Sequence, residues 1–281
     1  MRLGVHLSIK DGFSGVLEKA AELNCDGFQI FAGNPRGWAR KPLDPNDINT
    51  FREKQNLCQF APIVIHLSYL PNPASIDQEL YEKSVITLVE DYQRANLLGA
   101  DYFVFHPGKA KDTTKETALE RVAAAVNFTL SKVTGPTVLL FENQAGSGNE
   151  IAASMREMAD LKQRVNPEYQ QRIGMCFDTC HAFAAGYDLR GKDGWEQLIA
   201  EIDHYLGINF LKLFHLNDCL GKLGSHLDRH QHIGEGEIGL EGFKYLMNHP
   251  VLKEIPGILE TPQKDPGDDL KNLATLRNLA N

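Results

Sequence analysis

The chain has 281 residues and a formal net charge of −8, with 29 Lys and Arg residues against 37 Asp and Glu. Its 42% hydrophobic and 23% charged residues are typical of a folded globular protein and exclude a disordered chain, a collagen-like repeat and a disulfide-dense miniprotein. No apolar run reaches the roughly 18 residues that a membrane span needs, and residues 1–6 lack the apolar region of a signal peptide. We therefore expect a cytoplasmic protein.

The cysteine usage fits that compartment. Five cysteines are scattered along the chain, an odd number without the C-x-x-C spacing of a redox or zinc motif. In a reducing cytosol they are expected to be free thiols. The acidic balance weighs against broad nonspecific binding to nucleic acid but leaves room for a local basic groove.

The predicted elements alternate along the chain between short apolar runs and longer amphipathic stretches. The apolar runs, rich in Val, Ile, Leu and Phe, predict buried parallel strands at residues 3–6, 28–31, 63–66, 102–106, 138–142, 173–178, 211–217 and 257–260. Helical spacing predicts helices at residues 13–23, 80–98, 116–133, 151–163, 195–206, 240–247 and 270–279. Residues 32–45, 71–75 and 219–239 read as long loops.

This alternation predicts the fold class. Eight strands with a helix in nearly every gap favour a TIM (β/α)8 barrel, forming a single domain over residues 1–281. A doubly wound parallel sheet is the alternative, but it would normally carry a Gly-rich phosphate turn after its first strand. Residues 6–12 contain no G-x-G-x-x-G pattern.

The predicted strands share an unusual feature where they end. Six consecutive apolar runs, each about one βα unit from the next, finish in His66, His106, Glu142, Asp178, His215 and Glu260. In a barrel the carboxyl ends of all strands meet on one face, where active sites lie. A single polar residue at such a place is more often a helix cap or a hydrogen-bonding group, but six in succession are hard to explain that way.

Metal binding explains the six residues better. Several carboxylates crowded together repel one another and take up protons unless cations neutralise them. Imidazole and carboxylate donors without thiolate fit Zn²⁺, and also Mn²⁺ or Fe²⁺. A catalytic zinc has three protein ligands, so six candidates indicate more than one metal.

Three further residues are candidate ligands. His181 follows Asp178 by three residues, on the adjoining loop or first helical turn. Asp228 and His230 form an Asp-x-His pair whose side chains project to the same side of an extended segment. His181 as a helix cap, and Asp228 and His230 as plain loop residues, remain alternatives. His6 ends the first strand and is either a site residue or a pocket wall.

The motifs resemble those of the endonuclease IV family, the metal-dependent apurinic/apyrimidinic endonucleases of AP endonuclease family 2. The resemblance covers essentially the whole chain. The most specific matches are the run from Asp178 to Asp188 and the loop Asp228-Arg229-His230. Further matches are His66-x-Ser68-Tyr69-Leu70, Phe105-His106-Pro107-Gly108, Glu142-Asn143, Ala145-Gly146, His215-Leu216-Asn217-Asp218, Gly234-Glu235-Gly236 and Leu259-Glu260-Thr261.

The resemblance implies a TIM barrel that holds three zinc ions in a deep pocket. It groups His66, His106 and Glu142 on a first metal. Glu142 would bridge to a second metal held also by Asp178, His215 and Glu260, and a third would be held by His181, Asp228 and His230. Mn²⁺ or Fe²⁺ at some of these sites is an alternative.

The implied activity is DNA repair. The family hydrolyses the phosphodiester 5′ to an abasic site in duplex DNA, leaves a 3′-hydroxyl and a 5′-deoxyribose phosphate, and removes blocked 3′ ends. The resemblance implies a three-metal mechanism in which hydroxide, formed near the catalytic Glu142, attacks the phosphate. Arg36 matches the family's loop that enters the minor groove, and Tyr69 and Leu70 match its intercalating pair.

Charge, motif departures and surface pattern give three further expectations. The DNA face must be basic on an acidic chain, and Arg36, Arg40, Lys41, Lys109 and Arg229 are the candidates. Two positions depart from the family's usual pattern, Asp11 before Gly12 and Gln144 after Asn143, which affects the expected substrate range more than metal binding. No heptad or long apolar edge invites association, so we expect a monomer.

A sugar isomerase or epimerase on the same barrel is the main alternative. Such enzymes also hold a divalent metal at strand ends, but normally at one site. The additional candidates His181, Asp228 and His230 count against that alternative. A binding barrel that has lost catalysis is a second alternative, and the presence of every matched ligand counts against it.

Overall fold

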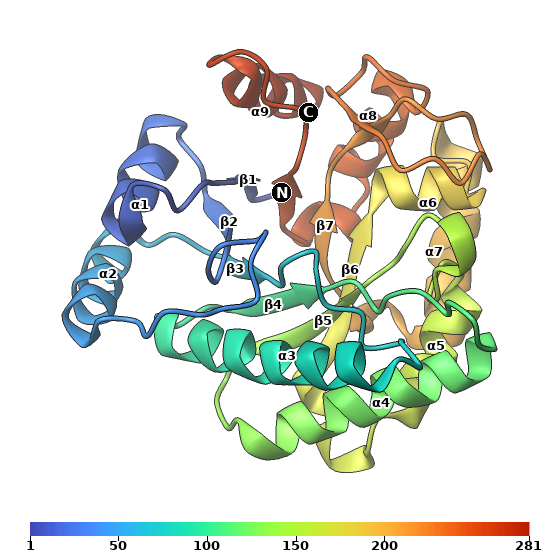
Figure 1. Cartoon of the computed structure of the whole chain (residues 1–281). Helices are drawn as coiled ribbons and strands as arrows, with labels where there is room; N and C mark the ends of the chain where they lie inside the picture. The colour runs from blue at the N-terminus through green and yellow to red at the C-terminus, as the bar shows by residue number, and fades with distance from the viewer. Residues whose placement is uncertain (281) are drawn as a thin grey trace.

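The computed structural model describes residues 1–280 and contains a closed barrel of parallel strands (Figure 1). Around the barrel the strand order is β1-β10-β7-β6-β5-β4-β3-β2. These strands are β1 (Leu3–His6), β2 (Gly27–Phe31), β3 (Ile63–His66), β4 (Tyr102–Phe105), β5 (Val138–Glu142), β6 (Ile173–Asp178), β7 (Leu211–His215) and β10 (Gly257–Leu259). The predicted TIM barrel is thus confirmed, and closure between β1 and β10 excludes the open doubly wound sheet.

Helices surround the strands (Figure 1). They are α1 (Gly12–Glu22), α2 (Pro45–Cys58), α3 (Gln78–Leu98), α4 (Lys115–Lys132), α5 (Met155–Arg164), α6 (Thr179–Ala185), α7 (Lys192–Leu206), α8 (Gly239–Asn248) and α9 (Asp268–Leu279). Short 3₁₀ helices lie at η1 (Ser147–Asn149), η2 (Pro167–Arg172), η3 (Ile208–Phe210) and η4 (Leu252–Glu254). Within residues 1–280 no helix is both long and apolar enough to cross a bilayer.

The helices differ from the predictions at several points. The short helix α6 was not predicted beyond a first turn at His181 as one alternative, and α7 begins at Lys192, three residues before the predicted start. Helix α2 occupies a segment for which no helix was predicted, because only Phe51 of its residues is buried and the apolar stripe that marks a helix is missing. Helix α5 begins at Met155, later than the predicted residue 151, since Ala152 has a left-handed φ of 60° and Ser154 caps the helix by accepting the Glu157 N–H.

The barrel interior explains why the strand ends gather on one face. Six fully buried side chains form a separate cluster inside the barrel: Val64, Val104, Leu140, Cys176, Leu213 and Ile258. Each lies two residues before one of the six strand-end candidates. Side chains two residues apart point to the same side of a strand, so the candidates form the next layer above this apolar floor.

The segment between β7 and α8 is a long loop over that face. It begins at β8 (Asp218–Cys219), returns at β9 (His230–Gln231), and these two form a small antiparallel pair separate from the barrel. The predicted loop 219–239 therefore has a fixed two-stranded base, with Cys219 opposite His230.

Candidate metal centre

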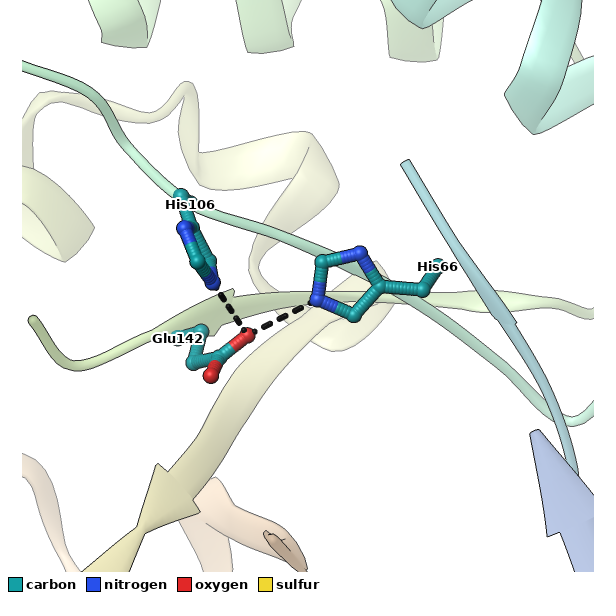
Figure 2. A group of neighbouring side chains, drawn as sticks. All are labelled: His66, His106 and Glu142. Atoms are coloured by element: carbon teal, nitrogen blue, oxygen red, sulfur yellow. Dashed lines mark hydrogen bonds and ion pairs between the residues drawn. The ribbon is translucent and has the colours of Figure 1, made fainter. Parts of the chain in front are cut away.

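Glu142 lies at the centre of the candidate site. It ends β5, is fully buried, and four imidazoles approach its carboxylate. Its Oε2 lies 3.0 Å from His66 Nε2 and 3.1 Å from His106 Nε2, so the two rings converge on one oxygen (Figure 2). Its Oε1 lies 3.1 Å from His215 Nδ1 and 3.3 Å from His181 Nδ1. Each carboxylate oxygen of Glu142 thus faces a different pair of rings.

A second group shares Glu142. Ligand atoms of Glu142, Asp178, His215 and Glu260 all lie within 4.8 Å of one another. Glu260 Oε2 is 3.2 Å from His215 Nδ1, and Asp178 and His215 are fully buried. Three carboxylates at this spacing would repel one another strongly without compensating positive charge.

A third group lies toward the pocket mouth. Asp228 Oδ1 is 3.4 Å from both His181 Nε2 and His230 Nε2. His181 is on the first turn of α6, where Asp178 caps the helix by accepting the His181 backbone N–H at 2.8 Å. The structure thus places the His181 ring in the cluster while Asp178 caps the helix, and it brings all nine predicted ligands together.

The imidazoles are held in defined orientations by backbone or amide oxygens. His66 Nδ1 lies 2.6 Å from the Leu67 carbonyl, and His181 Nδ1 lies 2.9 Å from the Asn143 carbonyl. His230 Nδ1 lies 3.0 Å from the Glu260 carbonyl. A carbonyl oxygen only accepts, so each of these Nδ1 atoms donates, and the Nε2 of the same ring is left to bind a metal ion or a second proton. Ligand histidines in metalloproteins are held in this way.

These Nε2 atoms face carboxylates. His66 Nε2 faces Glu142, and His181 Nε2 faces Asp228. His230 Nε2 is buried without a hydrogen-bond partner, 3.4 Å from an oxygen of Asp228 and 3.6 Å from one of Asp178. Lone pairs facing anionic oxygens repel unless a proton or a cation lies between them. The donor set and the unpartnered nitrogen therefore fit divalent metal ions.

Proton affinities in the cluster follow the same logic. Burial alone would lower the pKa of His181, but Asp178, Asp228 and Glu142 raise this pKa well above 6.5. Burial also opposes protonation of His215, yet Cys176, Glu260 and Glu142 raise its pKa well above 6.5.

The carboxylates shift in the opposite sense. Burial would raise the pKa of Glu142, but His106 and His215 hold this pKa well below its usual range. The pKa of Asp228 falls to about 2 because the hydrogen bond and charge of His181 outweigh burial. In the metal-free chain, protons on the imidazoles supply the positive charge that the carboxylates require.

Buried amides fix the remaining carboxylates, and sequence reasoning did not select them. Asn217 Nδ2 donates to Asp178 Oδ2 at 2.7 Å, and Gln29 Nε2 donates to Glu260 Oε1 at 2.6 Å. The Gln29 Oε1 atom accepts from His215 Nε2 at 2.8 Å. The available signal was Gln29 itself, the one polar residue within the apolar strand β2.

A cavity of about 520 Å³ opens above the cluster. Its walls include ligand candidates, the rings of Phe31 and Tyr69, and Arg229. Tyr69 is 69% exposed and packs edge-to-face against Phe31, with ring centroids 5.2 Å apart. His6 lies in the wall as well, with Nδ1 3.2 Å from Glu260 Oε1, so it contacts the site through a candidate ligand.

The predicted DNA-contacting residues lie on loops. Arg36 is exposed on the segment between β2 and α2, and Leu70 is half-buried next to the exposed Tyr69. The prediction that Arg40 belongs to the basic face is wrong. Its side chain is 3% exposed and donates to both Asp91 oxygens, at 2.7 and 2.9 Å, so its charge is already neutralised.

The two departures from the family pattern have different surroundings. Gln144 is buried, and its Nε2 donates to the carbonyls of Gly108 at 2.8 Å and Ile151 at 2.7 Å. It thereby ties together the segments that follow β4 and β5. Asp11 is exposed and makes no side-chain cap to α1. Neither residue belongs to the three ligand groups.

Sequence comparisons identify similar proteins over the full length. A family model described as a xylose isomerase-like TIM barrel matches residues 17–279. A protein of Methanoculleus marisnigri described as probable endonuclease 4 is 42% identical, with 99% of this chain and 98% of the relative covered. A protein of Halothermothrix orenii with the same description is 43% identical, with 97% and 99% covered.

Solved structures agree with these matches. The crystal structure of endonuclease IV from Thermus thermophilus is 39% identical and superposes with a TM-score of 0.87, over 99% of this chain and 98% of that chain. A D-tagatose 3-epimerase-like protein superposes with a TM-score of 0.74 over 99% and 97%, at 20% identity. The second likeness shows only that the barrel is shared.

Proposed function

Because the chain belongs to the endonuclease IV family, we propose that it is a DNA-repair phosphodiester hydrolase that cleaves duplex DNA 5′ to abasic sites. The products are a 3′-hydroxyl and a 5′-deoxyribose phosphate, and blocked 3′ ends are removed at the same site. Full-length similarity to proteins described as endonuclease 4 supports the nuclease class. The cluster above the barrel floor supports a metal-dependent reaction.

The proposed cofactor is three zinc ions per chain, with Mn²⁺ or Fe²⁺ acceptable at some sites. His66, His106 and Glu142 would hold the first ion. Glu142, Asp178, His215 and Glu260 would hold the second, and His181, Asp228 and His230 the third. The observation that carries this proposal is the orientation of the rings, whose Nδ1 atoms face carbonyls while their Nε2 atoms face carboxylate oxygens. His230 Nε2, buried without a partner, is the clearest case.

Bound metals would supply hydroxide at neutral pH and stabilise charge on the phosphate and the leaving oxygen. The chain's own residues hold that centre in place. Glu142 offers one oxygen to each of two ligand groups and so fixes their separation. Gln29 and Asn217 prevent Glu260 and Asp178 from rotating away. The apolar floor beneath excludes water from below.

DNA binding is proposed to involve the loops at the cavity mouth. Arg36 would enter the minor groove, and Tyr69 with Leu70 would fill the gap left when the abasic nucleotide leaves the stack. The exposed position of Tyr69 beside the cavity supports this role. The proposed partner is abasic-site duplex DNA, bound by a monomer.

A nicking assay tests the proposal. The zinc-loaded protein is incubated with a 5′-labelled duplex that carries one tetrahydrofuran abasic analogue, and the same duplex without the analogue is the control. We expect a single cut 5′ to the analogue, with a product that a DNA polymerase extends directly. Absence of cutting together with epimerisation of a ketose would contradict the proposal and favour the sugar epimerase.

A further inference from the structure

One buried carboxylate outside the ligand groups has an unusual set of partners. Asp218 directly follows Asn217 and is fully buried. Its oxygens accept backbone N–H groups at 2.8 to 3.2 Å from Cys219, Gly234, Gly236, Ile238 and Gly239. No ion pair to Asp218 is present among residues 1–280, so backbone amides provide the compensation for its charge.

These amides come from both ends of one loop. Cys219 lies at the start of this loop, after β7, while Gly234 and Gly236 lie near its end, before α8. The Asp218 carboxylate therefore joins the start of the loop to its end. A second bond reinforces the junction, since the Glu237 N–H donates to the Cys219 carbonyl at 2.7 Å.

The junction is tightly packed around Gly236. A Cβ at this position would lie 2.5 Å from Asp218 Oδ1 and 2.5 Å from the Cys219 carbonyl oxygen. Real Cβ atoms do not approach so closely. Glycine is therefore needed for the backbone to reach the Asp218 carboxylate, and an alanine there would push the two loop ends apart.

The same loop carries two of the proposed ligands. Cys219 lies opposite His230 in the β8–β9 pair, and the Leu220 N–H donates to the Arg229 carbonyl at 2.9 Å. Asp228 and His230 flank Arg229. The two-stranded base therefore helps to hold their side chains at the candidate centre, together with the contact of His230 Nδ1 with the Glu260 carbonyl.

We propose that Asp218 is a positioning residue for the third metal, acting through the loop that holds Asp228 and His230. This inference rests on the ligand grouping given under Proposed function. The carboxylate does not contact the metal. It closes the base of the loop, while the Gly224 and His226 N–H groups hold the far end by donating to the Phe183 and Ala184 carbonyls of α6 at 3.1 and 2.9 Å. The base and the far end together set the distance from Asp228 and His230 to His181 on α6.

Metal content of Asp218→Asn tests this role. Asparagine keeps the size of the side chain. Its NH₂ group cannot accept a hydrogen bond, so part of the acceptor capacity for the five backbone N–H donors is lost. After zinc loading and gel filtration, we expect elemental analysis to show loss of the third metal and retention of the other two. Asp101→Asn is the matched control, because Asp101 accepts the Ile63 N–H at 2.8 Å at the amino ends of the strands. The control should keep the wild-type metal content.

Hydrogen exchange on the metal-free proteins gives a readout independent of activity. In Asp218→Asn, amides of residues 219–239 should exchange about tenfold to a hundredfold faster, since bonds to a charged acceptor are among the stronger ones. Amides of β5 should be unchanged. Gly236→Ala should give the same pattern, and it serves as the test if Asp218→Asn does not fold.

The outcomes separate this inference from the proposed function. If His230→Ala alone removes the third metal, adding Asp218→Asn should remove no more, because both act on one site. Wild-type protein that binds fewer than three metals would contradict the ligand grouping itself. Wild-type protein with three metals, alongside variants that also keep three and show unchanged exchange, would overturn the role of Asp218.

Discussion

At the scale of single residues, the site is organised around one carboxylate. Glu142 is the only candidate that belongs to two of the proposed metal groups, and each of its oxygens faces two imidazoles. Such a residue sets both the charge and the spacing of the centre. Replacing it should therefore affect catalysis far more than the fold or the DNA-contacting loops.

We expect Glu142→Gln to lower abasic-site cleavage by roughly a hundredfold to a thousandfold or more. The neutral amide has one acceptor oxygen and cannot serve two metals in the same way. DNA affinity, measured by fluorescence anisotropy, should survive. Glu53→Gln, on the exposed surface of α2, is the control and should cleave normally. Turnover near the wild-type rate in Glu142→Gln would refute this role.

The raised pKa values of His181 and His215 predict that the pH dependence of stability has opposite directions in the metal-free and the metal-loaded protein. In the metal-free chain, this stabilisation is fully present below the ordinary pKa of 6.5 and is lost as the pH rises through the raised values. Zinc needs the unprotonated rings, so the loaded protein should gain stability over the same range. Melting temperatures of both forms from about pH 6 to about pH 9 test this. Melting temperatures that change with pH in the same way in both forms would argue against zinc binding at these two histidines.

At the scale of elements, the loops differ in what anchors them. The segment between β2 and α2, which carries Arg36, is held by Arg40, whose guanidinium bonds Asp91 of α3 and the Gly37 carbonyl. The hydrogen bond and charge of Asp91 raise the pKa of Arg40 further, although burial opposes the shift. Sequence reading assigned Arg40 to the DNA face, because its pairing with Asp91 in space is invisible in a sequence.

Arg40→Ala should destabilise the protein by about 3–5 kcal/mol, because it leaves Asp91 buried without its partner. Lys41→Ala, at the exposed neighbouring position, should change the free energy of unfolding little. Urea unfolding of both variants measures the difference. If both variants are equally stable and only Arg40→Ala loses DNA affinity, Arg40 contacts DNA directly after all.

Tyr69→Ala should weaken binding to abasic-site DNA by about tenfold to a hundredfold, the range expected for a lost stacking contact. The melting temperature should hardly move, because the ring is 69% exposed and packs mainly on Phe31. Ile86→Ala, an exposed apolar residue on α3, is the matched control. An unchanged dissociation constant for Tyr69→Ala would remove this residue from the DNA surface.

Strand-end ligands could be predicted because each follows an apolar run, and the topology then brings them together. Helix α2 could not be predicted, because only one of its residues is buried and its sequence lacks a helical repeat of apolar residues. Gln29 and Asn217 were missed because buried amides look ordinary in a sequence until their partners are known. The loop of Asp228 and His230 was found through the family resemblance and the Asp-x-His spacing, while its dependence on Asp218 appears only in three dimensions.

At the scale of the whole molecule, the barrel and the centre depend on each other. An apolar layer fills the barrel, and directly above it lie carboxylates and imidazoles that come from six strands. Cations that neutralise this layer would also link the strands. Removing metal with a chelator should therefore lower the melting temperature by roughly 10 °C, and zinc should restore it. An unchanged melting temperature after removal of the metal would show that the metals act in catalysis and do not stabilise the barrel.

Polyvalent metal ions are proposed to occupy the cluster around Glu142 and to enable hydrolysis at abasic sites. The most direct measurement is elemental analysis of the purified protein, coupled to nicking of an abasic-site duplex before and after treatment with a chelator. We predict three metals per chain, loss of nicking when they are removed, and recovery when zinc is returned. Protein free of transition metals that nicks the duplex equally well with or without chelator would contradict the account.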